Sequence, residues 1–578
     1  EFLLDRLREK HPGRPQELSS RVAAWFAEQG KAEQAIDYYL AGEEYETAID
    51  LIAQQVSEVV QHRGHHDVLF RWLEKMPAQY LQRQPKVSIC YAWSLIFSRH
   101  LDRVEEALSN IQQNHIPVSK DPHNSSESNW IQWNLGMLDA MFDLMYGRVV
   151  AAHRKTSDWL VRWPDAPEFE RGVVLGVHGI SCIHVLDLVA AKKAQREART
   201  ALARSDSDYG VSWMSFLHGQ ILCLQGRVTE ARHFLEDAFA VAQQQMGSRS
   251  VGAQLLKLGL GHVSYITHDT ERARQYFEFS LESIAEHGSV DSILMAFLSQ
   301  SNLQFQQGQK QASLELLHKA ETYGERLNLS HFQLSVVDQR IQRVLAEENP
   351  QQARQLFSDH GLDKPESNSD QFTELESLQI ALLTARFQLA DRSSDKAIES
   401  TASLMDFCGK HGLLIEYLRS GVLQARALYD NGEANKAYRL LQKLFATASD
   451  NMLLSPFLEE QYYLAPLWPD FFKRYGTAPE TDASRIDFVQ RLTQALNISE
   501  LVSIDAEGDS DTAQPLEALS GKEQEILRYL NQGLSNKELA ETLFVSVSTI
   551  KWHLTHIYAK LGVKSRVEAI KAYQVLGL

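Results

Sequence analysis

The sequence predicts an all-α protein in which an α-solenoid of helical-hairpin repeats is followed by a tethered domain of four short helices. Almost every window of the 578 residues follows the helical period, and no stretch of any length alternates as a strand does. A motif with a small residue recurs at intervals of about forty residues between residues 147 and 437. Beyond residue 516, capping sequences mark the starts of several short helices.

Length and charge indicate several domains with different partners. A chain of 578 residues is too long for one core, and its 44% hydrophobic and 23% charged residues are ordinary for a folded protein. The formal net charge is −17. From Glu517 onward eight Lys/Arg face six Asp/Glu, so this tail carries +2 and the remainder −19. Because an acidic body repels DNA, nucleic acid is expected to bind only the tail.

Cysteine usage and hydropathy predict a cytoplasmic protein. Cys90, Cys182, Cys223 and Cys408 are far apart and form no C-x-x-C pair, which favours reduced thiols over disulfides or a zinc site. No run of eighteen apolar residues occurs, so no membrane contact is expected. The chain starts at Glu1 within a helical pattern, and we therefore expect it to be a piece of a longer protein.

Residues 1–85 are predicted to form a helical connector. Three amphipathic stretches with tight turns cover residues 18–26, 30–40 and 41–52. Their turns follow one another more closely than the breaks in the rest of the chain, which indicates a different set of shorter helices.

Residues 86–500 are predicted to form the repeat domain. In each repeat a short break containing Gly, Asn or Asp precedes a helix whose first turn contains Ala. The instances are Gly147–Ala152, Gly226–Ala231, His268–Ala273, Gly308–Ala312, Asn349–Ala353, Ser394–Ala397 and Gly432–Ala437. A small residue there lets two antiparallel helices approach closely. Since one pair cannot bury its apolar face alone, neighbouring pairs must stack into a tetratricopeptide-like (TPR-like) solenoid with one curved inner surface.

Residues 501–515 are predicted to form a flexible linker. Within them the segment from Ser503 to Pro515 is acidic, rich in small residues and without apolar period. The last domain, residues 516–578, is therefore expected to reorient freely.

This last domain is predicted to present one helix to DNA. Ile550, Leu554, Ile557 and Leu561 recur at spacings of four, three and four, which places them on one side of a helix, the core side. The other side and its flanks carry no carboxylate; they consist of Ser548, Lys551, Trp552, Thr555, His556, Ala559 and Lys560. Such a face suits the major groove of DNA.

Helix starts in this domain follow the S-x-x-E pattern of a capping box. The pairs are Ser520 with Glu523, Ser535 with Glu538 and Ser565 with Glu568, and Ser546 marks a fourth start. The helix that begins after Ser535 is separated from the next by a turn too short for anything but a steep crossing. This is helix-turn-helix spacing.

The stretches Gly533-Leu-Ser-Asn-Lys-Glu-Leu-Ala540, Thr549-Ile-Lys551 and Lys560-Leu-Gly-Val563 closely resemble LuxR-type helix-turn-helix domains. The resemblance implies that Lys551, Trp552 and Thr555 read bases. It also implies phosphate contacts for Asn536, Lys537, Ser548, Thr549, His556 and Lys560. Trp552 departs from the smaller residue often present in the family, which leaves the base preference open.

Other interpretations fit several of these residues. Asn536 and Lys537 also suit the polar first turn of a capped helix. His553 lies near the core side, where a packed, hydrogen-bonded histidine is equally consistent. Trp552 can anchor a protein partner instead of reading bases.

Together with the connector and the repeats, the chain resembles the C-terminal portion of MalT-like large LuxR-family regulators. The resemblance implies an activator that binds double-stranded promoter DNA, a small-molecule inducer and RNA polymerase, and that self-associates when full-length. The family carries an ATP-binding domain ahead of this region, so ATP is expected only outside this chain and no cofactor within it. No G-x-x-x-x-G-K-[ST], H-E-x-x-H or G-x-S-x-G motif occurs, so no enzymatic activity is expected.

Aromatic residues and carboxylates gather in the first third of the repeats and form the candidate inducer site. They are Trp130, Trp133, Asp139, Asp143, Tyr146, His178, Tyr209 and Trp213. Aromatic faces beside carboxylates suit a sugar or another small polar inducer, although the same residues also fit ordinary solenoid core. His62, His65, His66 and Asp67 form a His-rich cluster that a polar turn explains, so no metal site is expected.

A second hypothesis is a helical-repeat scaffold that is regulated by a protein partner. It predicts a stable protein complex with the isolated residues 86–500 and no small-molecule ligand. The regulator hypothesis predicts instead that a screen of small molecules finds one that binds the repeat domain.

Overall fold

A computed structural model describes the chain as two compact units, Glu1–Val502 and Ser503–Leu578, which are considered separately. The described residues are 9–11, 13–81, 83–115, 126–287, 290–326, 329–362, 372–475, 483–499, 521–531, 534–543, 550, 554, 557–558, 563, 566 and 569. The predicted linker at residues 501–515 lies outside them. None of the described residues belongs to a β-strand, which agrees with the predicted all-α class.

The first unit starts with short helical elements, which include the three predicted amphipathic stretches. They are α2 (Arg14–Glu28), α3 (Ala32–Ala41), α4 (Tyr45–Val56), the π-helical η1 (Ser57–His62), α5 (His66–Leu73) and α6 (Ala78–Leu81). Next come α7 (Pro85–Phe97), the 3-10 turn η2 (Leu101–Arg103) and α8 (Val104–His115).

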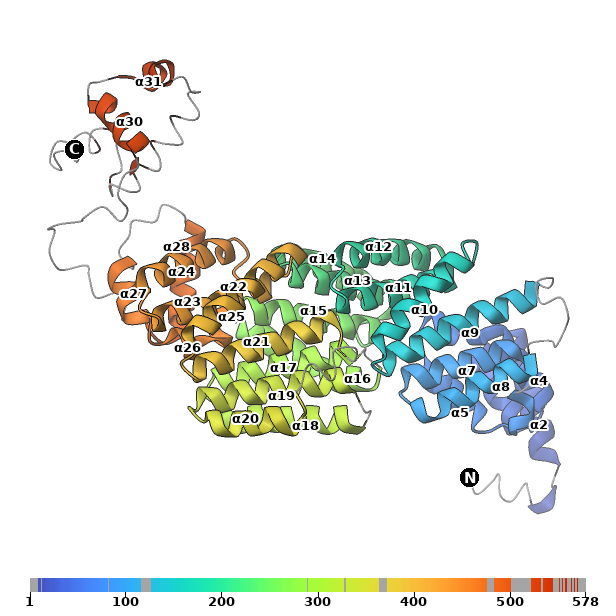
Figure 1. Cartoon of the computed structure of the whole chain (residues 1–578). Helices are drawn as coiled ribbons and strands as arrows, with labels where there is room; N and C mark the ends of the chain where they lie inside the picture. Colours follow the sequence, from blue (N-terminus) through green and yellow to red (C-terminus); the bar gives the residue numbers. More distant parts are fainter. Residues whose placement is uncertain are drawn as a thin grey trace. The chain divides into compact units, whose positions relative to one another are not determined.

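Eight helical hairpins follow and stack side by side (Figure 1). They are α9 (Ser126–Met145) with α10 (Val149–Arg162), α11 (Glu168–His184) with α12 (Leu188–Arg204), α13 (Asp208–Leu224) with α14 (Val228–Met246), α15 (Val251–Ile266) with α16 (Thr270–His287), α17 (Val290–Gln306) with α18 (Lys310–Arg326), α19 (Ser330–Ala346) with α20 (Pro350–Asp359), α21 (Glu374–Ala390) with α22 (Ser394–His411) and α23 (Leu414–Asp430) with α24 (Ala434–Ser449). The helices α25 (Ser455–Glu459), α26 (Gln461–Leu464), α27 (Trp468–Tyr475) and α28 (Ala483–Ala495) complete the unit.

The turn inside each hairpin repeats one backbone pattern. The turn residue has a positive φ; the eight are Gly147, Leu186, Gly226, His268, Gly308, Glu348, Arg392 and Gly432. The amide of the following residue donates to the carbonyl five positions before it, as Arg227 does to Leu222 at 2.8 Å. These bonds satisfy carbonyls that the helix end leaves without partners. The turn recurs every 39 to 44 residues, which confirms the predicted repeat.

A small side chain without exposed surface lies five positions after each turn residue. The eight are Ala152, Ala191, Ala231, Ala273, Ser313, Ala353, Ala397 and Ala437, each 0% exposed. The prediction of Ala312 was wrong by one position, because Ala312 is half-buried and Ser313 takes the buried place. The hairpin at Leu186 was not predicted, because a leucine stands where the other breaks have glycine or a polar residue.

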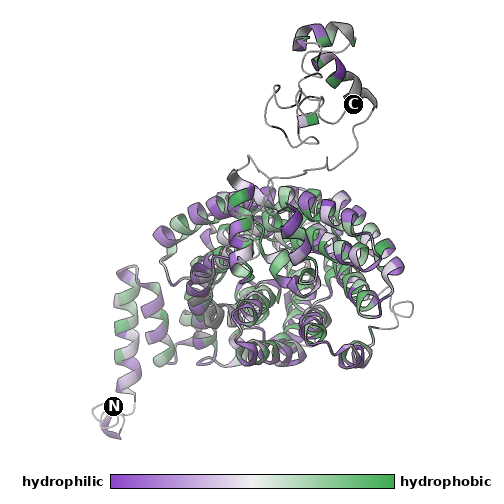
Figure 2. Ribbon diagram, turned by 90° about the vertical axis from the view of Figure 1, so that its left-hand side faces the viewer, coloured by the Kyte–Doolittle hydropathy of each residue, from purple (hydrophilic) through white to green (hydrophobic). Residues whose placement is uncertain are grey.

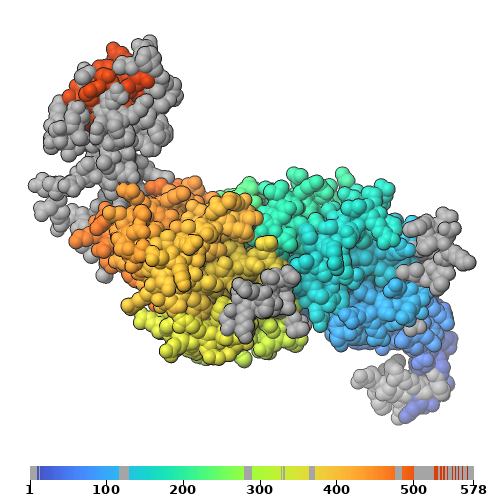
Figure 3. Space-filling view, viewed as in Figure 1, coloured from blue at the N-terminus to red at the C-terminus, as the bar shows by residue number. Residues whose placement is uncertain are grey.

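The row of hairpins also folds back on itself. Helix α11 contacts α21, and α13 contacts α23, so hairpins far apart in the sequence touch. Cys182 and Leu382 share one buried apolar cluster, and the Leu454 amide donates to the Ile266 carbonyl at 3.0 Å. In Figure 3 the cyan surface of the earlier hairpins meets the yellow surface of the later ones. The sequence predicted a curved inner surface, whereas the structure encloses much of it.

Helices of the first unit carry hydrophobic and hydrophilic residues close together, as amphipathic helices do (Figure 2). Within the described ranges, no helix combines the length and apolar character needed to cross a membrane.

Replacing a buried small residue should separate the two helices of its hairpin. We expect Ala397→Leu to lower the free energy of unfolding by about 1–3 kcal/mol, because the added methylenes overpack the helix contact. Chemical denaturation followed by circular dichroism measures the change. The control is Ala402→Leu on the exposed side of the same helix α22, and equal destabilisation by both variants would contradict the role given to Ala397.

Candidate DNA-binding unit and ligand cavities

The second unit is built on the helices α30 (Gly521–Asn531) and α31 (Asn536–Thr542). Its other described residues with helical backbone are Ile550, Leu554, Ile557, Tyr558, Arg566 and Ala569. A small apolar core joins these segments through Ile526, Leu527, Leu530, Leu539, Ala540, Ile550, Leu554, Ile557 and Ala569.

The aliphatic row predicted to face this core does so. Ile550 and Ile557 are 0% exposed and Leu554 is 5% exposed. Leu561, the fourth member of the row, lies outside the described residues. Burial at spacings of four and three residues confirms the core side of the predicted DNA-reading helix.

The start of α31 is held from two sides. Ser535 and Glu538 form the predicted capping box, in which the Ser535 amide donates to Glu538 at 2.7 Å and the Glu538 amide donates to the Ser535 hydroxyl at 3.3 Å. These hydrogen bonds lower the pKa of Glu538, so it carries its charge at neutral pH. Arg566 donates to the carbonyl of Leu534 and, at 3.4 Å, to the side chain of Asn536. Residues near the end of the chain therefore fix the helix that supports the reading helix.

Most of the predicted DNA contacts stay predictions. Asn536 is half-buried at the first position of α31, where its side chain accepts from Arg566, and Lys537 is helical but its side chain is not described. The predicted contact residues outside the described part are Ser548, Thr549, Lys551, Trp552, Thr555, His556 and Lys560. His553 and the other two predicted capping boxes also fall there in whole or in part.

The predicted inducer residues separate into three places, with His178 apart from all of them. In the first, Asp139 and Asp143 accept from Lys155 at 2.7 and 2.6 Å, and Asp143 also accepts from Arg148 at 2.6 Å. The Arg148 guanidinium lies over the ring of Tyr146 at 4.7 Å. These groups tie α9 to α10, and their charges are already compensated within the hairpin.

In the second place, Trp130 and Trp133 are half-buried on α9 and pack against the main core. The Trp133 ring meets Trp163 edge-on with centroids 6.1 Å apart, and its carbonyl accepts from the Trp159 indole at 3.1 Å. Both tryptophans fit the alternative interpretation as solenoid core. His178 lies apart from them, on α11.

In the third place, Tyr209 and Trp213 line an apolar cavity of about 100 Å³. The remaining wall is mostly aromatic and aliphatic, with Trp93, Phe97, Met141, Leu144, Met145, Phe169, Val177, Ile180 and Met214. Neither the Tyr209 hydroxyl nor the Trp213 indole has a well-formed hydrogen bond to a described residue. Burial raises the pKa of Tyr209, so its hydroxyl stays protonated. The cavity wall is thus mostly apolar, and its few polar groups include Gln61, His184, Ser207 and Asp291.

Two further cavities continue from this one inside the repeats. A connecting cavity shares Ile180, His184 and Asp291 with the apolar cavity. It shares Glu416 and Arg419, among others, with a third cavity of about 230 Å³ that is polar. Because they share walls, the three cavities are neighbours. The polar part of the wall grows from the apolar cavity through the connecting cavity to the polar cavity.

A buried ionic network lines the polar cavity. Arg386 is 2% exposed; it donates to Asp338 at 3.2 Å and pairs with Glu460, which is 1% exposed. Although burial alone would lower the pKa of Arg386, these two carboxylates raise it, so the guanidinium stays charged. Arg419 donates to Glu416 and Glu459, at 2.5 Å each.

The network extends through neutral groups to other helices. The Tyr265 hydroxyl donates to Glu459, Asn302 donates to that hydroxyl at 2.9 Å, and Arg343 donates to Asn302. Inner helices from α15 to α23 are thereby joined. The sequence motifs did not single out this network, although a charged residue within an apolar helical stretch, such as Arg386, was an available signal.

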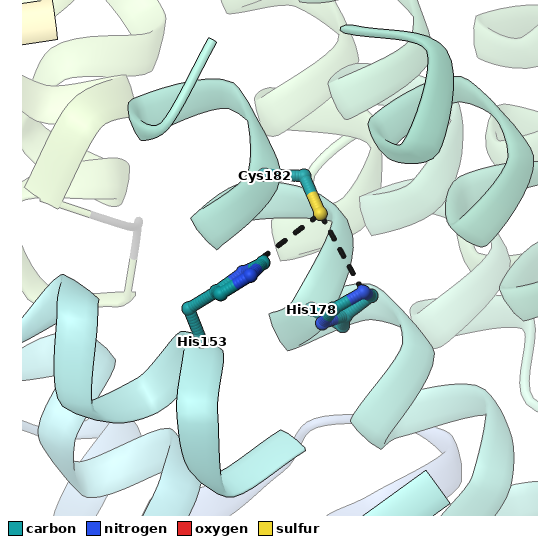
Figure 4. Close-up of side chains that lie close together, drawn as sticks. All are labelled: His153, His178 and Cys182. Carbon is teal, nitrogen blue, oxygen red and sulfur yellow. Dashed lines mark hydrogen bonds between the residues drawn. The ribbon is translucent and has the colours of Figure 1, made fainter. Parts of the chain in front are cut away.

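The His-rich cluster predicted to be a polar turn is dispersed in the structure. His66 is buried, lies 3.2 Å from the Ser94 hydroxyl and stacks on Phe97, while His62 approaches the carbonyl of Asp206. Among the described residues, a group with metal-ligand spacing occurs elsewhere, at His153, His178 and Cys182 (Figure 4).

His184 pairs with Asp291 at 3.1 Å where the apolar and connecting cavities meet. Burial lowers the pKa of His184, but the charge and hydrogen bond of Asp291, helped by Glu376, outweigh burial and raise it. A raised pKa in the folded state stabilises the protein below the unfolded pKa, near pH 6.5, and this stability is lost as pH rises through the folded pKa.

The destabilisation caused by Asp291→Asn should therefore be largest in mild acid. We expect the difference in melting temperature between wild type and variant to be larger at about pH 6 than at about pH 9. Differential scanning calorimetry at both pH values measures it. A difference that grows with pH would contradict the pairing. Asp395→Asn, on the outer helix α22, serves as the control.

Two family models match the chain. The MalT-like TPR region matches residues 137–473, and the luxR family of bacterial regulatory proteins matches residues 517–573.

Relatives match over nearly the whole chain or over a short part of it. The HTH-type transcriptional regulator AlkS of Pseudomonas putida is 22% identical over 564 residues, which cover 97% of this chain and 61% of the relative. AlkS of Alcanivorax borkumensis is 21% identical over 571 residues, 96% of this chain and 62% of the relative. The oxygen regulatory protein NreC of Staphylococcus aureus is 44% identical over 81 residues, 14% of this chain and 37% of that protein.

The chain thus spans about three-fifths of the length of the AlkS relatives. The first family model alone covers more than half of the chain, and the second covers the unit in which the capping box and the buried aliphatic row were found. The chain belongs to the LuxR-family transcriptional regulators with a MalT-like TPR region.

Proposed function

We propose that this chain is the sensing and DNA-reading portion of a ligand-responsive transcription activator. The repeat unit binds a small molecule, and the second unit binds promoter DNA through the helix that contains Ile550, Leu554 and Ile557. Recruitment of RNA polymerase and self-association belong to the full-length protein in this proposal, as does any use of ATP. The apolar cavity beside Tyr209 and Trp213 is the observation that supports sensing.

The walls of the cavity favour a ligand with an apolar body. Aromatic and methionine side chains supply most of the lining, and the exposed polar atoms are few. A sugar, the kind of inducer considered from the sequence, would lose its hydration there without enough hydrogen bonds in return. The connecting and polar cavities can hold a polar end group of the same molecule.

DNA reading can be tested on the residues implied by the LuxR resemblance. The double variant Lys551→Ala, Thr555→Ala should bind a DNA fragment selected by the wild-type chain at least about tenfold more weakly, because each good base contact contributes about 1–3 kcal/mol. Fluorescence anisotropy at fixed salt measures the affinity. Arg528→Ala, on the exposed side of α30, removes a positive charge from the same unit and should change binding little. Equal weakening by both would reject the assignment.

Ligand binding can be tested by thermal shift on the full chain. Medium-chain alcohols and small aromatic molecules should raise the melting temperature, and sugars should not; at a hundred times its dissociation constant a ligand adds about 2.7 kcal/mol. Leu144→Trp fills the cavity with a larger side chain and should abolish the rise in melting temperature. Leu160→Trp, a half-buried leucine of α10 away from the cavity, should keep it. No shift with any compound would favour a scaffold regulated by a protein partner.

A further inference from the structure

We propose that His153, His178 and Cys182 bind a thiophilic transition-metal ion, with Zn(II) as the reference case. His153 comes from α10, whereas His178 and Cys182 lie one turn apart on α11 (Figure 4). Two imidazoles and one thiolate form a donor set that Zn(II) and other thiophilic ions prefer to harder cations.

The spacing of the three donor atoms fits a tetrahedral ion. Cys182 Sγ lies 3.5 Å from His178 Nε2 and 3.9 Å from His153 Nδ1, and all three donor atoms lie within 4.8 Å of one another. Zn–S bonds of about 2.3 Å and Zn–N bonds of about 2.0–2.1 Å, at a tetrahedral angle, require a sulfur–nitrogen distance of roughly 3.6 Å. Little movement is therefore needed to place an ion among them.

A second layer of hydrogen bonds sets the orientation of His178. The Thr156 hydroxyl is fully buried and donates to the Ala152 carbonyl at 2.8 Å. Its oxygen can then accept from His178 Nδ1–H, 3.0 Å away. This tautomer leaves the Nε2 lone pair directed at Cys182. Metal-bound histidines in proteins are commonly held by such a partner on the other ring nitrogen.

The other two donors change protonation when the ion binds. Ser181 donates to the His178 carbonyl at 2.8 Å, so its oxygen accepts from His153 Nδ1–H at 3.1 Å when no metal is bound. Binding of the metal ion moves that proton to Nε2 of His153 and releases the thiol proton of Cys182 to solvent. Coordination thus replaces the hydrogen bonds of His153 to Ser181 and of Cys182 to His178 by three bonds to the metal.

The position of the cluster connects it with the ligand cavity. Val177 and Ile180 of α11 line the apolar cavity, whereas His178 and Cys182 of the same helix do not line it and lie beside His153 of α10. An ion bridging α10 and α11 would hold this wall of the cavity in place. This coupling rests on the proposed function, but binding of the ion does not.

Metal binding can be measured without any ligand or DNA. The metal-free chain of 578 residues, titrated with Co(II), should develop the charge-transfer absorption of a cobalt–thiolate bond, saturating at one ion per chain, and Zn(II) should displace the Co(II). Cys182→Ser should remove the band. Cys223→Ser, a buried cysteine outside the cluster, should keep it. Thr156→Val should weaken Zn(II) binding about 10- to 100-fold, the usual effect of losing such a partner.

Absence of the band from the wild-type chain, or its persistence in Cys182→Ser, would overturn the proposal and leave a hydrogen-bonded packing cluster. If Cys182→Ser fails to fold, the half-buried His153→Gln variant decides, since it should fold and lose the band. If the wild-type chain fails to bind Co(II) while an apolar ligand still raises its melting temperature, the metal site is rejected and the proposed function stands.

Discussion

Close approach of two helices at a small buried residue is the contact on which the repeat unit depends. In each of the eight hairpins a residue with positive φ ends the first helix, and a side chain no larger than serine, five positions later, lies in the joint. A larger side chain would hold the helices apart. The same spacing occurs at Gly30 with Ala35 and at Glu43 with Ala48. Connector and repeats therefore share one local rule despite different helix lengths.

The row of hairpins returns to itself, so that α11 touches α21 and α13 touches α23. This closure turns an inner surface into an interior. Charges that would be solvated on an open concave face become buried, and they must find partners there. Arg386 and Arg419 do so with four carboxylates, whereas replacing one partner alone would leave an uncompensated buried charge. The polar cavity lies in this interior, between side chains of α15, α17, α19, α21 and α23.

The DNA-binding unit relies on a much smaller core. Its described helical segments share nine buried side chains, and the capping box of Ser535 with Glu538 and the reach of Arg566 to Leu534 add local constraints. The net charge of +2 in this tail, against −19 in the rest of the chain, directs DNA to that unit.

Local features of the amino-acid sequence alone determined the helical class, the hairpin period, the capping box at Ser535 and the buried row at Ile550, Leu554 and Ile557. Each depends on residues within a few turns of one another, so spacing is enough to find it. Tertiary structure decided what depends on distant contacts. Side chains from several helices between α7 and α13 enclose Tyr209 and Trp213 in an apolar cavity, and contact between α9 and α10 sets Asp143 against Lys155. Arg386 meets Glu460 across 74 residues of sequence, and the packing of α10 on α11 sets His153 beside Cys182. No sequence motif singled out these pairs, because contacts between helices set them.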